Sequence, residues 1–427
     1  MKNTTSKSLL FSDNRVELLE QLPENSLAIV AAADFMPKSA DQNFPFYQNS
    51  DFFYLTGLNQ EKSVLCLCKS HPNPAMREVL FLLAASPEME TWTGHRYTKD
   101  EVRQISGIQT ILSLDDFHSK LKELMVLSKK VYFLKNEAVN YLQEIPTWPD
   151  LLSQRIKNDY PLHEYDRLSP LLATMRLIKK TAEIDAISKA IDISGKVLHR
   201  VLKTVKPGLH EYQVSADITH EVLWNGGSGH AFEPIVASGK NACVLHYVTP
   251  KDLLKNGDLL LIDFGAEWNH YASDCSRTFP IGGKFSKRQR ECYDAVLRVF
   301  KKALSLYVPG STINKINDQV NQWMEEEMIG LGLFSKKDVK NQNPDAPLFR
   351  KYFMHGTAHF IGLDVHDVGM KHVPLKNGMV LSCEPGLYIA EENIGIRIEN
   401  MVLVNKKPVD MMKNYPVEVE EIERIMK

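Results

Sequence analysis

Hydrophobic and polar positions follow two different patterns along the chain. From residue 26 to about residue 172, short apolar runs such as SLAIVAAAD and EVLFLLAAS alternate with charged helical segments around residues 99 to 105 and 114 to 126. Short apolar runs between helical segments are typical of strands in a layered domain. The pattern therefore predicts a three-layer α/β domain over residues 1–174.

A helical pattern then opens the second part of the chain. Hydrophobic residues from Ile184 to Val201 recur at spacings of three and four, which predicts one buried face of a long helix. Thr181 is suited to cap the start of this helix, and Glu183 falls in its first turn. We place the domain boundary between residues 174 and 175.

The second part, residues 175–427, carries one pattern twice. Segments that begin at Pro207 and Pro309 each start with Pro-Gly, continue as an amphipathic helix and end at glycines. Each follows another predicted helix, at residues 181–204 and about 286–306, and each precedes strand-like runs. Two such helix, helix, hairpin units predict a duplicated α+β domain whose antiparallel strands lie back to back.

Acidic residues occupy the first of the two predicted hairpins, KNGDLLLIDFGAEWNHYASDCSRTFPIGG. A two-residue loop at Trp268 and Asn269 would place Asp263 directly opposite Asp274, with Cβ atoms about 5 Å apart. Facing carboxylates in an apolar sheet repel each other, and burial disfavours both charges. A bound cation would neutralise them.

The second hairpin, SCEPGLYIAEENIGIRIENMVLV, poses the same question. A turn at Glu391 and Glu392 would place Glu384 opposite Glu399, although a bulge at Pro385 would break this register. The first hairpin therefore carries more weight than the second. On spacing alone, the alternative that each acid is an ordinary turn or edge charge stays open.

Three histidines, His355, His359 and His366, lie in the segment HGTAHFIGLDVHD. Gly356 follows the first of them where a helical zinc motif would have glutamate, so that motif is absent. Four carboxylates with one imidazole form an oxygen-rich site, which suits Mn²⁺, Co²⁺ or Fe²⁺ and does not exclude Zn²⁺. Four negative charges balance two divalent cations, which would permit a bridging hydroxide at neutral pH.

These segments resemble the metallopeptidases of the pita-bread fold and, among them, the aminopeptidase P family. The similarity lies in LLIDFGAEWNHYASDCSRTFP, HGTAHFIGLDVHDVG, LSCEPGLYI and GIRIEN. FYQNSDFFYLTGL, at residues 46–58, resembles the N-terminal domain that accompanies aminopeptidase P and prolidase. The resemblance implies a creatinase/methionine aminopeptidase-like catalytic domain over residues 175–427, preceded by the smaller α/β domain.

The resemblance also implies a ligand set for two divalent metal ions, with Mn²⁺ expected and Co²⁺, Fe²⁺ and Zn²⁺ as alternatives. The implied ligands are Asp263, Asp274, His359, Glu384 and Glu399. Asp274 and Glu399 would bridge the ions. Glu384 would also carry a proton from the attacking metal-bridging hydroxide toward the leaving nitrogen.

Further roles follow from the same resemblance. His366 would hydrogen-bond the scissile peptide and its tetrahedral oxyanion, and His246 and His355 would contact the substrate. Arg397 would support the catalytic groups, and Tyr388 would support the substrate-binding groups.

The implied reaction removes the first residue of a peptide whose second residue is proline. Proline forms a tertiary amide without an N–H, so its site must hold the ring with apolar walls and grip the free α-amine instead. Prolidase, which cuts only Xaa-Pro dipeptides, stays open because the basic clamp it needs cannot be identified in the sequence. A metal-free creatinase-like hydrolase or binding protein also stays open, although the complete ligand set argues against it.

The composition of the chain mainly excludes classes of partner. The 427 residues carry a net charge of −2 with no basic stripe, which argues against nucleic acid or anionic membrane as a partner. No apolar run approaches the roughly 18 residues of a membrane span or forms a signal-peptide core. We therefore expect a soluble cytoplasmic protein, and the resemblance implies a homo-oligomer.

Overall fold

The computed structural model describes residues 4–135 and 145–427. The chain divides into two compact units, Met1–Met175 and Arg176–Lys427. Among the helices of the described residues, none is both long enough and apolar enough to span a membrane.

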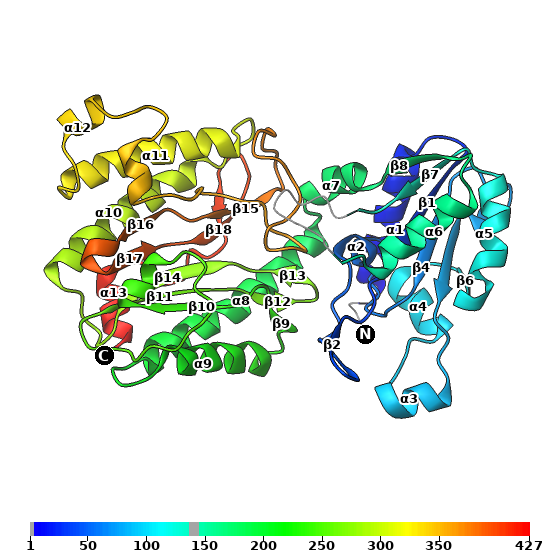
Figure 1. The fold of residues 1–427 in the computed structure, drawn as a ribbon, viewed down its shortest axis with the longest axis horizontal. Helices are drawn as coiled ribbons and strands as arrows, with labels where there is room; N and C mark the ends of the chain where they lie inside the picture. The colour runs from blue at the N-terminus through cyan, green and yellow to red at the C-terminus, as the bar shows by residue number, and fades with distance from the viewer. Residues whose placement is uncertain (1–3, 136–144) are drawn as a thin grey trace. The chain divides into compact units, whose positions relative to one another are not determined.

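The first unit is built on a six-stranded mixed sheet (Figure 1). In sheet order the strands are β6 (Thr110–Ser113), β5 (Glu78–Leu82), β4 (Val64–Cys68), β1 (Ser26–Ala31), β7 (Lys130–Phe133) and β8 (Glu164–Arg167). β4 is antiparallel to both of its neighbours, and the remaining pairs are parallel. A separate small hairpin joins β2 (Pro37–Ser39) and β3 (Gln42–Asn43).

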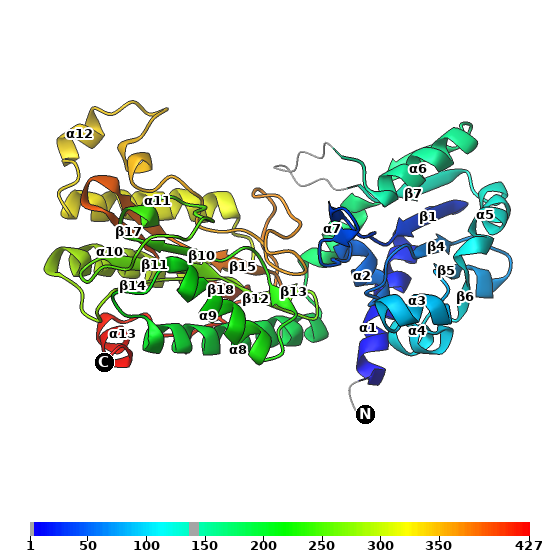
Figure 2. The same cartoon turned by 60° about the horizontal axis from the view of Figure 1, so that its bottom comes forward.

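Helices cover both faces of this sheet (Figure 2). The helices of this part of the chain are α1 (Thr4–Gln21), α2 (Ser50–Thr56), α3 (Pro87–Thr93), α4 (Lys99–Ser106), α5 (Phe117–Val126), α6 (Trp148–Asp159) and α7 (Ser169–Leu177), with short 3₁₀ turns η1 (Pro74–Met76) and η2 (Leu114–Asp116). Of these, α3 projects away from the sheet (Figure 1) and has no buried residue.

The central strands are buried on both faces because helices lie on each side of them. Every residue of β1 is buried, as expected for an inner strand of a covered sheet. On one face Leu27 and Ile29 of β1 share a core with Phe117 and Leu121 of α5. The three-layer α/β arrangement predicted for this part is confirmed.

The helices of the second unit lie in two layers with strands between them (Figure 1). They are α8 (Thr181–Thr204), α9 (Glu211–Trp224), α10 (Lys287–Ala303), α11 (Ile313–Gly330), α12 (Lys336–Lys340) and α13 (Val419–Ile425), with 3₁₀ turns η3 (Gly239–Cys243), η4 (Leu304–Leu306), η5 (Leu348–Lys351) and η6 (Ala390–Glu392).

The strands of this unit pair mostly as antiparallel hairpins. They are β9 (Gly229–His230), β10 (Ile235–Ser238), β11 (Leu259–Phe264), β12 (Ala266–Trp268), β13 (Tyr271–Ala272), β14 (Cys275–Pro280), β15 (Val380–Cys383), β16 (Gly386–Ile389), β17 (Ile394–Arg397), β18 (Asn400–Leu403) and β19 (Val409–Asp410). The helix pair α8 and α9 precedes β9 to β14, and the pair α10 and α11 precedes β15 to β19. The predicted duplicated α+β domain is confirmed.

The register predicted for the first acidic hairpin is wrong. Trp268 pairs with Tyr271, so the turn lies at Asn269 and His270, both of which have positive φ. A two-residue hairpin turn of this kind needs positive φ at both central positions, which asparagine tolerates far better than tryptophan. Asp263 consequently faces Ser276 and is a diagonal neighbour of Asp274 on the same face.

The register predicted for the second hairpin is confirmed. Cys383 pairs with Asn400 in one ladder and Gly386 pairs with Arg397 in the next. Glu384 and Glu399 lie opposite each other in the short gap between these two ladders. Pro385 falls in this gap, where its missing N–H interrupts no ladder hydrogen bond.

Candidate metal centre

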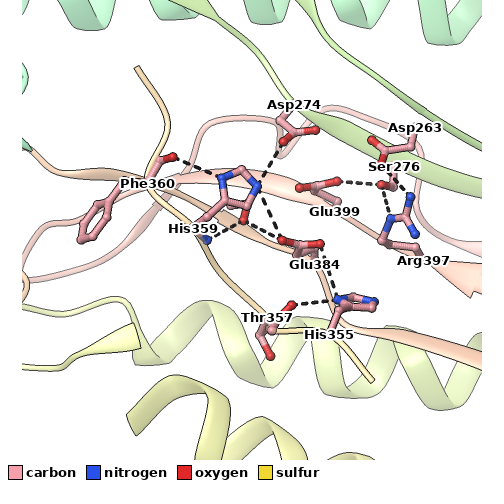
Figure 3. Close-up of polar contacts among 12 residues, drawn as sticks. Asp263, Asp274, Ser276, His355, Thr357, His359, Phe360, Glu384, Arg397 and Glu399 are labelled. Atoms are coloured by element: carbon pink, nitrogen blue, oxygen red, sulfur yellow. Dashed lines mark hydrogen bonds and ion pairs between the residues drawn. The ribbon is translucent and has the colours of Figure 1, made fainter. Parts of the chain in front are cut away.

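The five predicted ligands meet where the two hairpins lie side by side (Figure 3). Asp263 lies on β11, Asp274 directly before β14, His359 in the segment before β15, Glu384 directly after β15 and Glu399 directly before β18. Each acid therefore stands at or beside the end of a strand, where paired backbone fixes its Cα position. Main-chain bonds also join the two hairpins, since Glu399 N donates to Ser276 O over 3.1 Å.

Three of these side chains already have the spacing of a metal site. One ligand atom from each of Asp274, His359 and Glu399 lies within 4.8 Å of the other two. His359 Nε2 lies 3.3 Å from Asp274 Oδ2 and 3.6 Å from Glu384 Oε1. Four of the predicted ligands thus surround one small volume, and Asp263 adjoins Asp274.

The electrostatics of these acids favour a cation. Burial, followed by the charges of Asp263 and Glu384, raises the pKa of Asp274 well above its usual range. Burial, followed by the charges of Asp274 and Glu384, does the same to the pKa of Glu399. In addition, Asp263 Oδ1 and Asp274 Oδ1 are buried without a hydrogen-bond donor. A divalent ion would fit here, because it would satisfy these oxygens and remove the repulsion.

The ring of His359 is oriented as a metal ligand requires. Its Nδ1 lies 3.2 Å from the backbone oxygen of Phe360, so Nδ1 carries the proton and Nε2 presents its lone pair to the acids. The backbone N–H of His359 donates to Ser382 Oγ, and that hydroxyl donates to Glu384 Oε1 over 3.2 Å. Ser382 therefore couples the positions of the imidazole and the glutamate.

Arg397 ties the acids together from β17, with only 4% of its surface exposed. Its guanidinium donates to Asp263 Oδ2 over 2.6 Å, to Ser276 Oγ over 2.8 Å and to the hydroxyl of Tyr388 over 2.8 Å. Ser276 Oγ in turn donates to Glu399 Oε2 over 2.6 Å. Arg397 thus orients two acids at once and offsets part of their charge.

Models of two known families match the chain. The model of metallopeptidase family M24 matches residues 185–406, and that of the aminopeptidase P N-terminal domain matches residues 11–132. The chain belongs to metallopeptidase family M24. Within the family it groups with aminopeptidase P, because the aminopeptidase P N-terminal domain model matches the part of the chain that precedes the M24 match.

Curated and solved relatives are similar over nearly the whole chain. The Xaa-Pro aminopeptidases of Haemophilus influenzae and Escherichia coli are 34% and 35% identical, covering 97% of this chain and 96% and 97% of theirs. Proline aminopeptidase P II from Yersinia pestis has a TM-score of 0.88 at 32% identity, covering 98% of this chain and 99% of that one. Zinc-substituted Escherichia coli aminopeptidase P in complex with product has a TM-score of 0.88 at 33% identity, covering 98% of each chain.

Membership of family M24, together with Xaa-Pro aminopeptidase relatives at 34% and 35% identity over nearly the whole chain, shows that the protein is a metal-dependent aminopeptidase. The pita-bread fold expected for the second part is confirmed by the likeness to these structures. The cluster of Asp274, His359 and Glu399 is where this family member would hold a divalent ion.

Two further predicted histidines lie beside this family M24 centre as neutral rings. The ring of His366 lies edge-on to that of His359, with centroids 4.5 Å apart. Burial, with smaller contributions from His359 and His246, lowers the pKa of His366 to about 4. Burial and the charge of Arg397 lower the pKa of His355 to about 3.

His355 is held in place by two hydrogen bonds. Its Nδ1 lies 2.8 Å from the oxygen of Gly356, and its Nε2 lies 2.8 Å from the hydroxyl of Tyr388. Since Arg397 donates to the same hydroxyl, the Tyr388 O–H donates its hydrogen bond to His355 Nε2, which accepts. The exposed His246 lies close enough to influence the pKa of both other histidines.

Two residues that support this centre carry no signal in the sequence. Ser276 is an ordinary strand serine until its register shows that it faces Asp263. Arg277 is buried and donates to the backbone oxygen of Glu399 over 2.6 Å and to Asn400 Oδ1 over 2.7 Å. Both residues fall inside the quoted DCSRTFP segment, but only the three-dimensional pairing reveals what they touch.

A buried group of charges also holds the loop that carries His366. Asp367 accepts from Arg176 over 2.5 Å and from Lys179 over 2.7 Å, and all three side chains are at most 3% exposed. Arg176 also reaches Asp364 over 2.7 Å. The neighbour of His366 in sequence is therefore anchored to the segment that precedes α8.

Proposed function

We propose that the protein removes the first residue from peptides whose second residue is proline, with two divalent metal ions, Mn²⁺ being the expected ion. The ligands would be Asp263, Asp274, His359, Glu384 and Glu399. The observation that carries this proposal is the convergence of these five side chains, in which Asp263 Oδ1 and Asp274 Oδ1 are buried without a hydrogen-bond partner.

The charge balance supports two ions. Arg397 contributes one positive charge against four carboxyls, which leaves a large negative excess in a buried site. When bound, the ions would supply an activated water and polarise the scissile carbonyl. The same set of oxygen ligands suits Mn²⁺ and leaves Co²⁺, Fe²⁺ and Zn²⁺ as alternatives.

Glu384 is the proposed proton carrier. Its Oε1 accepts from Ser382, while its Oε2 lies 3.7 Å from His355 Nδ1 on the side of the substrate histidines. Burial raises its pKa above the usual range, which suits a group that must accept a proton and return it. Glu384 would take a proton from the attacking water and deliver it to the leaving nitrogen.

The neutral histidines are suited to bind the peptide. A neutral His366 ring would donate to the carbonyl oxygen of the scissile bond and hold it more tightly as negative charge develops. His355 and His246 would contact the substrate, with Tyr388 and Arg397 holding His355 in place.

We further propose that residues 1–174 form the accompanying aminopeptidase P-type domain and residues 175–427 the catalytic domain, in a cytoplasmic homo-oligomer. The N-terminal family match supports the first assignment, and the family resemblance supports the others. Light scattering of the purified protein would test the assembly: a monomer at all concentrations contradicts it.

Prolidase is the rival within the same fold. The names of the Haemophilus influenzae and Escherichia coli relatives favour the aminopeptidase. Rates on Gly-Pro and on an Ala-Pro-Ala tripeptide would separate the two. A strong preference for the dipeptide would replace the proposal with prolidase.

The deciding experiment measures metal and activity together. Protein stripped with a chelator should lose Ala-Pro-Ala hydrolysis and regain it with Mn²⁺, and the reloaded protein should hold two ions per chain by elemental analysis. Ala-Ala-Ala serves as the matched substrate without proline. Equal rates on both tripeptides, or full activity without metal, would refute the proposal.

A further inference from the structure

A buried glutamate outside the metal centre organises one complete loop. Glu211 is the first residue of α9 and has no exposed surface. Both of its carboxylate oxygens accept hydrogen bonds from the segment of residues 238–252. The donors to Oε1 are Ser238 N (2.7 Å), Ser238 Oγ (2.7 Å) and Asn241 Nδ2 (3.0 Å), and the donors to Oε2 are the Tyr247 hydroxyl (2.9 Å), Lys251 N (3.0 Å) and Asp252 N (3.0 Å).

All six of these donors are neutral groups, so the only charged partner in each hydrogen bond is the Glu211 carboxylate. Burial raises the pKa of Glu211, but hydrogen bonds from Asn241, Asp252 and Ser238 outweigh it and lower the pKa below its usual value. Hydrogen bonds to an ionised acceptor are roughly twice as strong as those between neutral groups. Glu211 Oε1 binds the start of the loop and Oε2 binds its end, so one side chain closes the segment.

The opposite side of the loop is seated on β17. Cys243, at the end of η3, donates its thiol to the oxygen of Ile394 over 3.4 Å. Gly395 allows this close approach, because a Cβ there would lie 2.2 Å from the oxygen of Ala242. The loop is thus held between α9 and the strand that carries Arg397.

His246 lies between these two attachments. It is exposed, as are Val244 and Val248 at 52% and 51%, whereas its direct neighbours Leu245 and Tyr247 are partly buried against a core cluster that includes Tyr388. His246 nevertheless lies close enough to His355 and His366 to influence both rings. Its position near these two rings therefore depends on the anchored parts of the loop.

We propose that Glu211 is a positioning residue, which fixes His246 over the substrate by closing the loop of residues 238–252. This inference rests on the proposed function, in which His246 contacts the peptide. Glu211 itself touches neither metal ligands nor substrate, so it acts only through the loop.

The test is a double-mutant cycle in the metal-loaded enzyme with Ala-Pro-Ala as substrate. Glu211→Gln keeps the shape but turns one acceptor oxygen into a donor that faces the loop's own donors. We expect about a tenfold loss in kcat/KM, carried mostly by KM. His246→Ala should lose at least as much, and Glu211→Gln added to His246→Ala should change little further, because coupled residues are not additive.

Two controls keep the outcome clear. Glu221→Gln removes one charge from the same helix α9 away from the loop and should leave the kinetics unchanged. Hydrogen exchange should show faster exchange of the Lys251 and Asp252 amides in Glu211→Gln, with β11 and β15 protected as before. If Glu211→Gln does not fold, Ser238→Ala and Tyr247→Phe remove single donors and replace it in the cycle.

The failures can be told apart. An inactive wild-type enzyme with metal defeats the proposed function. If the wild type is active but the losses in kcat/KM of Glu211→Gln and His246→Ala multiply in the double variant, this inference alone is wrong. Unchanged kinetics or unchanged loop exchange in Glu211→Gln would also overturn it.

Discussion

At the scale of single residues, burial raises the pKa of three acids of the centre, Asp274, Glu384 and Glu399. Glu384 differs from the other three acids because it faces both the metal cluster and His355. Its two oxygens are therefore placed for two tasks. Holding a metal ion requires the negative charge of the carboxylate, and carrying a proton is favoured by the raised pKa of Glu384.

We expect Glu384→Gln to keep the fold and to lower kcat by about 10³-fold or more, because it removes a ligand charge and the proton carrier together. Steady-state rates on Ala-Pro-Ala with saturating Mn²⁺ would measure this. Glu391→Gln is the matched control, since Glu391 lies at the exposed turn of the same hairpin. Near-normal turnover in Glu384→Gln would refute its role.

His366→Ala tests the other side of the proposed reaction. A donor whose hydrogen bond strengthens as the oxyanion forms should affect kcat more than KM. We expect kcat to fall about 10²-fold to 10³-fold, the usual loss for one oxyanion donor. A change confined to KM would reassign His366 to binding of the ground state.

At the scale of elements, the two hairpins show how far a sequence can predict a site. The four acids stand out in the sequence as charged residues among apolar strands, but only the family resemblance selected His359 from the three histidines of its segment and completed the ligand set. The register of the first hairpin could not be predicted, because it depends on which two residues of the turn adopt positive φ. The expected turn residues were Trp268 and Asn269, but the turn lies at Asn269 and His270.

The positioning residues show the same limit. Ser276, Arg277 and Glu211 act through neighbours that are far away in sequence, so no local pattern reveals them. The duplicated helix pairs and the second hairpin were predictable, since helical periodicity and strand pairing are local signals. What remained hidden was contact between elements.

The loop that carries His366 provides a prediction at this scale. Asp367→Asn leaves Lys179 and Arg176 charged in a buried place, because their side chains are only 1% and 3% exposed. Breaking one partner of a buried ion pair costs about 3–5 kcal/mol, which chemical denaturation would measure.

Asp364→Asn is its matched control. It changes another acid that pairs with Arg176, but the Asp364 side chain is 42% exposed. We therefore expect its cost to stay below about 1 kcal/mol. Equal losses in the two variants would show that burial does not set the strength of this anchor.

At the scale of the whole second unit, the metal centre joins the two duplicated halves. The first half supplies Asp263 and Asp274, and the second supplies His359, Glu384 and Glu399. Neither half holds the full ligand set. A bound ion should therefore stabilise the packing of the halves against each other, and the free energy of unfolding should depend on metal.

The dependence on pH follows from the raised pKa values of Asp274 and Glu399. In the metal-free protein these acids hold protons more tightly when folded than when unfolded. Their contribution to stability is complete below the unfolded pKa, about 4, and is lost as pH rises through the folded pKa. Metal replaces those protons, so the stabilisation by metal should grow from pH 5 to pH 8.

Thermal unfolding at pH 5 and pH 8, with chelator or with Mn²⁺, would measure this as a difference in Tm. At 100 times Kd one bound ion contributes about 2.7 kcal/mol. Asp274→Asn should abolish most of the metal effect at pH 8 and yet raise the Tm of the metal-free protein, because the amide carries no buried charge. A metal effect that is equal at both pH values would mean that these acids are not neutralised by the ion, and the ligand set would have to be redrawn.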